Sequence, residues 1–96
     1  MKRYIISRRA SLEIAEIIDF LSYRDMAAGE RFIQQFTQKC RYLTDFPLIG
    51  KLYAELLPEL RGVVLNRYII FYEVTDEAVT IVRVVRGDRD LKALFN

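Results

Sequence analysis

The clearest pattern in this chain lies between residues 68 and 86, where apolar residues fill two consecutive runs. The runs meet at the polar link Thr75-Asp76-Glu77-Ala78, and both are rich in β-branched and aromatic residues. Two such runs with a short polar link predict a β-hairpin. Because apolar residues occupy both alternating sets of positions, both faces of this hairpin need protection from water.

A turn centred on Asp76 and Glu77 assigns the strand residues to two faces. One face then carries Tyr68, Ile70, Tyr72, Val74, Val79, Ile81, Arg83 and Val85. The opposite face carries Arg67, Ile69, Phe71, Glu73, Thr80, Val82, Val84 and Arg86. A shift of one residue in the register would exchange these assignments.

We expect the face with Tyr68, Tyr72 and Arg83 to stay uncovered and to bind a partner. Tyrosine and arginine tolerate partial exposure and are enriched at protein interfaces. A charge within an apolar strand needs a partner, so Arg83 alternatively forms a salt bridge or stacks on Tyr72 or Tyr68. In the competing arrangement residues 87–96 fold back across this face, although a short segment with several charges makes a poor cover.

Two amphipathic helices precede the hairpin, because apolar residues recur there at three- and four-residue spacing. The first is expected over residues 8–23, after the N-cap candidate Ser7, with the stripe Ala10, Ile14, Ile17, Ile18 and Leu21. The second is expected from about residue 28 to 46, before Pro47, with the stripe Phe32, Ile33, Phe36, Cys40 and Leu43. The short link between them predicts an antiparallel helical hairpin. Glu13, Glu16 and Asp19 lie off the first stripe, so we expect them to be solvated.

Short β-rich segments at residues 4–6 and 61–65, and one more helical turn near residues 91–95, complete the pattern. The order β-α-α-β-β-β predicts an α+β fold, in which an antiparallel helical hairpin packs on a small antiparallel sheet. We expect residues 1–96 to form a single domain.

The composition places this chain among cytoplasmic proteins. No apolar run is long enough to cross a bilayer, and Met1-Lys2-Arg3-Tyr4 does not resemble the start of a signal peptide. The single cysteine, Cys40, fits a reducing compartment, and its position on the second stripe predicts a core residue.

The same composition excludes several common kinds of catalytic, metal and phosphate-binding sites. The chain has no histidine, which excludes imidazole catalysis, and a single cysteine excludes a thiolate zinc site. The four glycines are isolated from one another, so no phosphate loop is present. We therefore expect no cofactor and no metal. Net charge is only +2, but arginine supplies 11 of the 15 basic residues, which favours a macromolecular target.

Several local patterns follow one another in a specific order along nearly the whole chain. They are Tyr4-Ile5-Ile6-Ser7 leading to Ala10, the segment 12–18, an L-x-x-x-P-x-x-G element at 43–50, Glu59-Leu60-Arg61, the run 68–72, and R-V-x-x-G-x-R-D at 83–90. In this order and spacing they resemble the ParE branch of the RelE/ParE toxin superfamily, the toxins of type II toxin–antitoxin systems.

The resemblance implies a small toxin, associated with growth inhibition and plasmid stabilisation, that a cognate antitoxin neutralises. The antitoxin, expected to be of the ribbon-helix-helix type, would wrap the toxin with its C-terminal segment and alone contact operator DNA. ParE-like members are associated with inhibition of DNA gyrase, whereas RelE-like members cut mRNA on the ribosome. A divergent member with neither activity, serving in a repressor complex, is a further alternative.

Two departures from the RelE-like pattern favour gyrase. RelE-like sequences tend to carry arginine after the aromatic residue that begins the penultimate strand, where this chain has Ile69 after Tyr68. Their closing segment carries a further arginine and a tyrosine, where this chain has Leu91, Leu94 and Phe95. We therefore expect a toxin that has no catalytic residue, acts by binding and is not an enzyme.

Candidate target-binding residues are Arg61, Arg86 and Arg89, which the matched motifs contain. Arg86 and Arg89 alternate with Asp88 and Asp90, so a solvated turn with local ion pairs is the alternative. We expect Arg61 and Lys51 to join this patch across the end of the sheet, where a ribonuclease would use them to contact phosphate.

Overall fold

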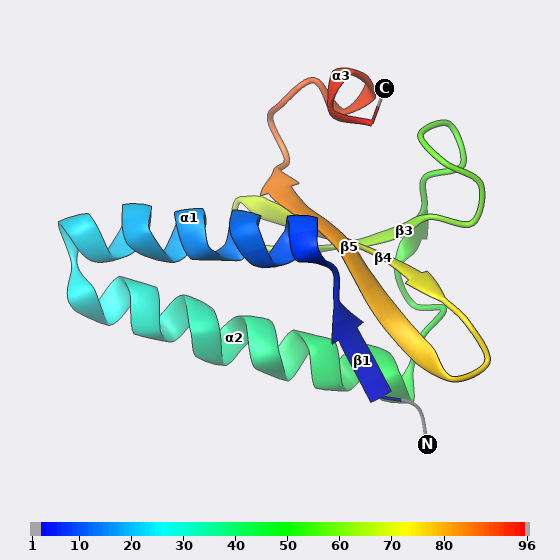
Figure 1. Ribbon diagram of the computed structural model, residues 1–96, viewed down its shortest axis with the longest axis horizontal. Coiled ribbons are helices and arrows are strands. Elements are labelled where there is room, and N and C mark those ends of the chain that lie inside the picture. The colour runs from blue at the N-terminus through cyan, green and yellow to red at the C-terminus, as the bar shows by residue number, and fades with distance from the viewer. Residues whose placement is uncertain (1–2, 96) are drawn as a thin grey trace.

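The computed structural model describes residues 3–95, so the expectations that include Met1, Lys2 or Asn96 extend outside the described residues. A helical hairpin packs against one face of a twisted sheet, and a short helix lies on the side of the opposite face (Figure 1). The elements are β1 (Arg3–Ile6), α1 (Arg8–Arg24), α2 (Met26–Asp45), β2 (Lys51–Leu52), β3 (Arg61–Leu65), β4 (Tyr68–Val74), β5 (Ala78–Arg86) and α3 (Leu91–Leu94).

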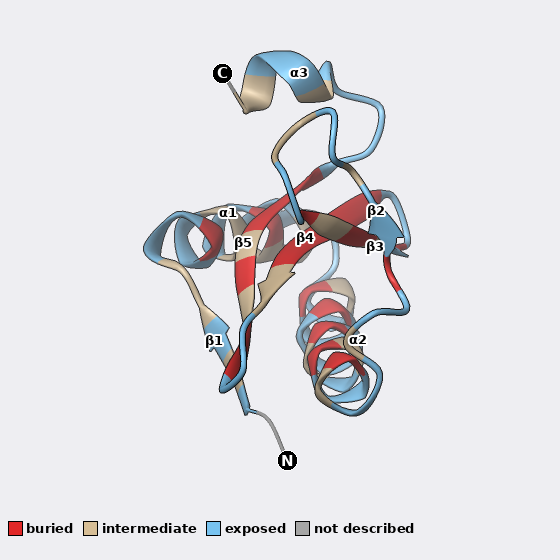
Figure 2. Cartoon of the chain, turned by 90° about the vertical axis from the view of Figure 1, so that its right-hand side faces the viewer, coloured by how far each residue is buried: buried red, intermediate tan, exposed pale blue. Residues whose placement is uncertain are grey.

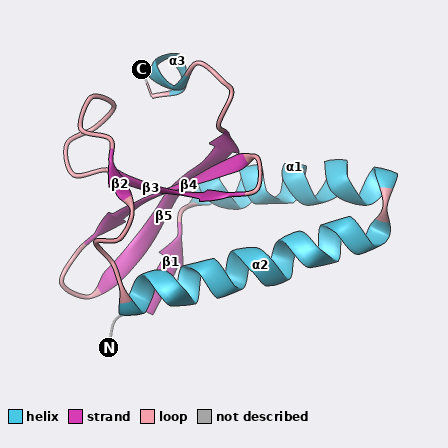
Figure 3. Ribbon diagram, turned by 180° about the vertical axis from the view of Figure 1, so that it is seen from behind, coloured by secondary structure: helices cyan, strands magenta, loops and turns pink. Residues whose placement is uncertain are grey.

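The sheet has the strand order β1-β5-β4-β3-β2. The pairs β5–β4, β4–β3 and β3–β2 are antiparallel, whereas β1 pairs with β5 in parallel. The α+β class is therefore confirmed, but the sheet is mixed and not antiparallel throughout. A parallel neighbour requires a long crossover, and the intervening chain from α1 to β4 supplies it (Figure 3).

Side-chain caps fix where the two long helices begin. The Ser7 hydroxyl accepts a hydrogen bond from the Ala10 backbone N–H at 3.1 Å, as expected of an N-cap. Asp25 accepts from the Ala27 N–H at 3.0 Å, so α2 begins at Met26, two residues before the predicted start. The predicted apolar stripes face the core, except that Ile33 is 45% exposed.

A β-bulge changes the faces of the β4–β5 hairpin. Val74 pairs with Val79 as the predicted turn requires, but the register shifts between Phe71 and Tyr72. Val82 is the extra residue, because Tyr72 pairs with Ile81 and Phe71 pairs with Arg83. From Arg83 to Arg86, each side chain therefore lies on the opposite face of the sheet from the one that uniform alternation predicts.

The expected open face was therefore wrong. Tyr68 and Tyr72 belong to the core beneath the helices, and Val84 joins them in place of Arg83 and Val85. Tyrosine is tolerated in this core because the Tyr72 hydroxyl donates to the Pro47 carbonyl at 2.7 Å and accepts from the Gly50 N–H at 2.9 Å.

The other face of the sheet is covered by the chain itself, as Figure 2 shows in its band of buried strand residues between helices and loops. A second core forms there around Leu60, Ile69, Phe71 and Val85. Its cover comes from the loop before β3 and from the C-terminal segment, namely Tyr53, Leu56, Leu57, Leu91, Leu94 and Phe95. The chain end therefore folds back onto the sheet, but it covers the face of Ile69 and Phe71 and not, as the competing arrangement expected, the face of Tyr68 and Tyr72.

Candidate binding groove

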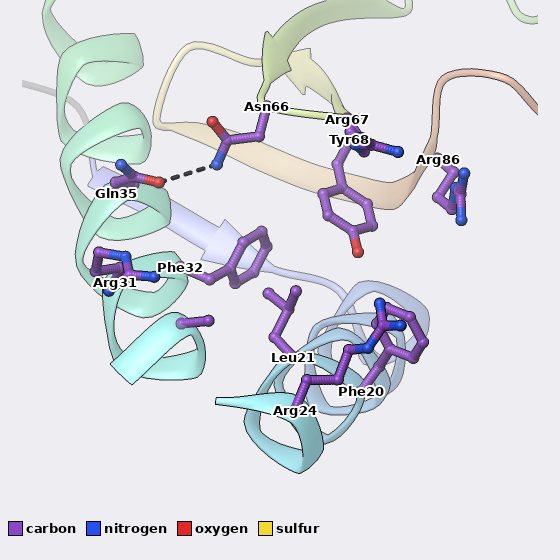
Figure 4. Close-up of a pocket in the computed structure, with 11 residues that line it drawn as sticks. Phe20, Leu21, Arg24, Arg31, Phe32, Gln35, Asn66, Arg67, Tyr68 and Arg86 are labelled. Carbon is purple, nitrogen blue, oxygen red and sulfur yellow. Dashed lines mark hydrogen bonds between the residues drawn. The ribbon is translucent and has the colours of Figure 1, made fainter. Parts of the chain in front are cut away.

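A groove of about 550 Å³ opens between the helical hairpin and the sheet. Figure 4 shows that its lining comes from the end of α1, the first half of α2, the β3–β4 turn and the end of β5. We call it the arginine groove. Its lining residues are Phe20, Leu21, Arg24, Ala28, Arg31, Phe32, Gln35, Asn66, Arg67, Tyr68 and Arg86.

The floor of the arginine groove is apolar and aromatic. Phe32 and Tyr68 are 2% and 9% exposed, and their rings meet edge to face with centroids 5.5 Å apart. Leu21 lies beside them on α1, half-buried (Figure 4). This floor is continuous with the core under the helices, so it is held in shape by packing.

Four arginines surround this floor, and all four are exposed. The Arg24 guanidinium lies 5.6 Å from the Phe20 ring centroid, while Arg31 approaches Asp25 at 3.6 Å. Arg86 pairs with Asp88 at 2.8 Å. Among the described residues that line the groove none is acidic, so the groove is a concentration of positive charge on a protein of net charge +2.

The β3–β4 turn positions Arg67 at the groove. Asn66 adopts a positive φ of 56°, a conformation that asparagine tolerates better than most residues. Its side-chain amide donates to Gln35 of α2 at 3.0 Å, the bond drawn in Figure 4. The turn is therefore tied to α2 across the groove.

The structure brings together some of the predicted site residues and separates others. Arg86 and Tyr68 both line the arginine groove, and Arg89 is exposed in the turn just after β5. Arg61 lies towards the other end of the sheet, because it pairs with Tyr72 of β4. Arg86 pairs with Tyr68 at the start of β4, and on the β3 side Tyr68 pairs with Leu65. The separation along β3 is four residues, roughly 13 Å of extended strand.

The expectation that Arg61 and Lys51 join a patch with Arg86 was therefore wrong. Arg61 donates to the carbonyls of Leu48 and Gly50, at 3.2 and 2.9 Å, and so holds the loop before β2. Lys51 lies on the edge strand beside it, 4.9 Å from the Tyr53 ring centroid.

Arg83 is engaged inside the protein and is only 7% exposed. Its guanidinium donates to a Glu13 carboxylate oxygen at 2.6 and 3.0 Å and also to the Leu94 carbonyl. It also lies 5.4 Å from the Phe95 ring centroid. The predicted salt bridge of Arg83 is confirmed, but its stacking partner is Phe95 and not a tyrosine.

Sequence reasoning missed Arg24, Arg31 and Arg67 as groove residues. Arg24 and Arg31 flank the short link between the helices, so an antiparallel hairpin could have brought them to one end. The unusual share of arginine was the other available signal.

The groove is suited to binding anionic groups. Guanidinium groups recognise carboxylates and phosphates through paired hydrogen bonds. Within residues 3–95 no three His, Cys, Asp or Glu side chains are grouped to hold a metal ion. No helix in the described part of the chain is long and apolar enough to cross a membrane.

Comparison with known proteins defines the class. The family described as the ParE toxin of the type II toxin–antitoxin system parDE matches residues 4–91, and the chain belongs to this family. Its fold is similar to a solved structure described as a chromosomal ParDE toxin–antitoxin system from P. aeruginosa. That likeness has a TM-score of 0.75 at 17% identity and covers 90% of this chain and 96% of the other. No curated protein matches the sequence.

Proposed function

We propose that this ParE-family chain inhibits DNA gyrase by binding it in the cytoplasm, until a cognate antitoxin of the ribbon-helix-helix type neutralises it. Family membership over residues 4–91 supports the toxin role. With a net charge of only +2, the toxin leaves contact with operator DNA to the antitoxin.

The composition of the arginine groove carries the proposal that the toxin acts without chemistry of its own. Cleavage of RNA needs a group that takes a proton from the 2′-hydroxyl and one that returns a proton to the leaving oxygen. Among the described lining residues only Tyr68 carries an acid–base group other than a guanidinium, so the groove offers one hydroxyl where the reaction needs two groups. Four guanidinium groups without such a pair bind anions and do not transfer protons.

The arrangement of the remaining cations also disfavours the RelE-like ribonuclease. Lys51 and Arg61 lie at the opposite end of the sheet from Arg86, so the three do not converge on one phosphate. Phe95, in the region where RelE-like toxins carry tyrosine, packs on Phe71 with ring centroids 5.0 Å apart.

Arg86 and Arg89 are the proposed contacts to gyrase. Both are exposed at the end of β5, and the ion pair of Arg86 with Asp88 is solvated, with side chains 45% and 66% exposed. A solvated pair contributes little stability, so Arg86 can exchange Asp88 for a group on the target.

The test measures supercoiling of plasmid DNA by gyrase with increasing toxin. Wild-type protein should inhibit, and the double variant Arg86→Ala/Arg89→Ala should need about tenfold more protein, as expected for loss of about 1.4 kcal/mol of binding. Arg8→Ala/Arg41→Ala, which removes two exposed arginines outside the groove, is the control with the same loss of charge and should behave like wild type. Unimpaired gyrase at all concentrations, with mRNA cut on ribosomes, would refute the proposal.

A further inference from the structure

We infer that the arginine groove binds an acidic peptide segment with a central apolar anchor residue, carried by the antitoxin. The inference deepens the proposed function and rests on it for the presence of an antitoxin. It adds the place of binding and the chemistry that the bound segment must have.

Among the described residues, those that line the groove carry only positive charge. Arg24, Arg31, Arg67 and Arg86 come from separate parts of the chain and converge on one groove that has no acidic lining residue. Two of them contact nearby carboxylates, but Asp25 and Asp88 are 57% and 66% exposed. Such exposed pairs are weak, so carboxylates of a bound segment can replace them.

The centre of the groove supplies the second argument. Leu21, Phe32 and Tyr68 form an apolar floor inside the ring of arginines (Figure 4). Within residues 3–95 the Tyr68 hydroxyl has no hydrogen-bond partner, although the residue is 9% exposed, and it points into the groove. An apolar centre with a polar rim is the usual arrangement of a peptide-binding site.

The same geometry disfavours nucleic acid as the occupant. Single-stranded nucleic acid binds by stacking its bases on exposed aromatic rings along a basic track. Here Phe32 and Tyr68 offer little ring surface, and the exposed ring of Phe20 already lies beside Arg24. The arginines encircle a hollow and do not follow a track.

A regulatory consequence follows from Arg86, which belongs both to the groove and to the proposed gyrase contact. A segment bound in the arginine groove would cover Arg86. Neutralisation would then be competition for one side chain, without any change in the fold of the toxin.

The test is a titration of isotopically labelled toxin followed by its backbone amide signals. The probe is a synthetic helical peptide in which glutamates surround a central leucine. Its lysine counterpart and a short single-stranded DNA are the comparison ligands. The acidic peptide should shift the amides of Phe32, Asn66 and Tyr68 and bind about tenfold or more tightly than either comparison ligand.

Two variants with equal loss of charge sharpen the result. Arg24→Ala/Arg67→Ala removes two groove arginines and should weaken peptide binding about tenfold or more, while Arg8→Ala/Arg41→Ala, which removes two arginines outside the groove, should change it less than about twofold. All four arginines are exposed, so each variant is expected to keep the dispersed amide spectrum of the fold.

Any one of four results would overturn the inference. They are the absence of saturable peptide binding, amide shifts confined to other surfaces, tighter binding of DNA than of the acidic peptide, and equal effects of the two variants. The titration contains no gyrase, so it is independent of the proposed target. A toxin that inhibits gyrase but ignores the acidic peptide would refute the groove assignment alone. A toxin that binds the peptide but leaves gyrase active would refute only the proposed function.

Discussion

At the scale of single residues, Arg83 and Glu13 form the ion pair most shielded from water among those of the described residues, with side chains 9% and 14% exposed. The other Glu13 oxygen accepts from the Val84 N–H at 2.9 Å. The sequence predicted a salt bridge for Arg83, but it assigned Glu13 to solvent. The partner could not be identified because 70 residues separate the two in the chain.

Removing Glu13 should therefore be costly. Glu13→Ala leaves the buried Arg83 guanidinium without a counter-charge and the Val84 N–H without an acceptor, so we expect a loss of about 3 kcal/mol in the free energy of unfolding. Glu16→Ala, an exposed glutamate on the same helix, should change it by less than about 0.5 kcal/mol. Urea unfolding measures both, and equal stabilities of the two variants would contradict the account.

Tyr72 should make stability depend on alkaline pH. Burial raises the pKa of its hydroxyl, against the smaller opposing effects of the Gly50 N–H and Arg61. Above pH of about 10, the ordinary tyrosine pKa, the unfolded chain loses this proton while the folded chain keeps it, so stability falls as pH rises. Tyr72→Phe should make this slope with pH shallower, and the slope that remains comes from the Cys40 thiol, whose pKa burial also raises.

The same substitution should also lower stability near neutral pH, by about 1–3 kcal/mol, because it leaves the Gly50 N–H without its partner. Tyr23→Phe is the control, since Tyr23 is 93% exposed. Thermal unfolding of both variants across the alkaline range gives the comparison. A slope with pH that is as steep in Tyr72→Phe as in the wild type would show that Tyr72 is not responsible.

Cys40 should be inert in the folded protein. It is fully buried, and burial raises the pKa of its thiol to about 12, so the reactive thiolate is scarce at neutral pH. A colourimetric thiol reagent should react at once in denaturant and only at the rate of unfolding without it. Rapid reaction of the native protein would contradict the placement of Cys40 in the core.

At the scale of elements, hydrophobic periodicity was sufficient to locate both long helices and the strands β3, β4 and β5. It could not locate the bulge at Val82, because uniform alternation contains no mark of an inserted residue. The structure shows tertiary partners around the bulge. The Ser7 hydroxyl donates to the Val82 carbonyl at 3.0 Å, and Glu13 accepts from Val84, where β1 no longer covers the edge of β5.

The C-terminal segment that ends in α3 should protect the second core. Phe95 packs on Phe71 and beside Arg83, so Phe95→Ala is expected to destabilise the protein by about 2 kcal/mol and to expose apolar surface. Because apolar surface is exposed, the Phe95→Ala variant should also bind more of a hydrophobic fluorescent dye than the wild type does. Lys92→Ala, an exposed change in the same helix, should leave stability and dye binding unaltered, and an equal rise in both would contradict this role.

At the scale of the whole molecule, the arginine groove is assembled from four places that no local pattern connects. Arg24 and Arg31 depend on the helical hairpin, Arg67 on a turn with a positive φ at Asn66, and Arg86 on the far end of β5. The sequence pointed to Arg86 through a motif, whereas it pointed to Tyr68 through the expectation of an open face that the structure contradicts. The rest required the relative placement of helices and sheet, which side-chain packing determines.

The central claim is that this toxin acts by binding and not by turnover, and stoichiometry tests it most directly. A fixed concentration of gyrase is titrated with toxin, and the loss of supercoiling activity is followed together with the integrity of mRNA on ribosomes. We predict that inhibition saturates as the toxin approaches equivalence with gyrase, while the mRNA stays intact. Full gyrase activity at a molar excess of toxin, with mRNA cut by trace amounts of it, would contradict the claim.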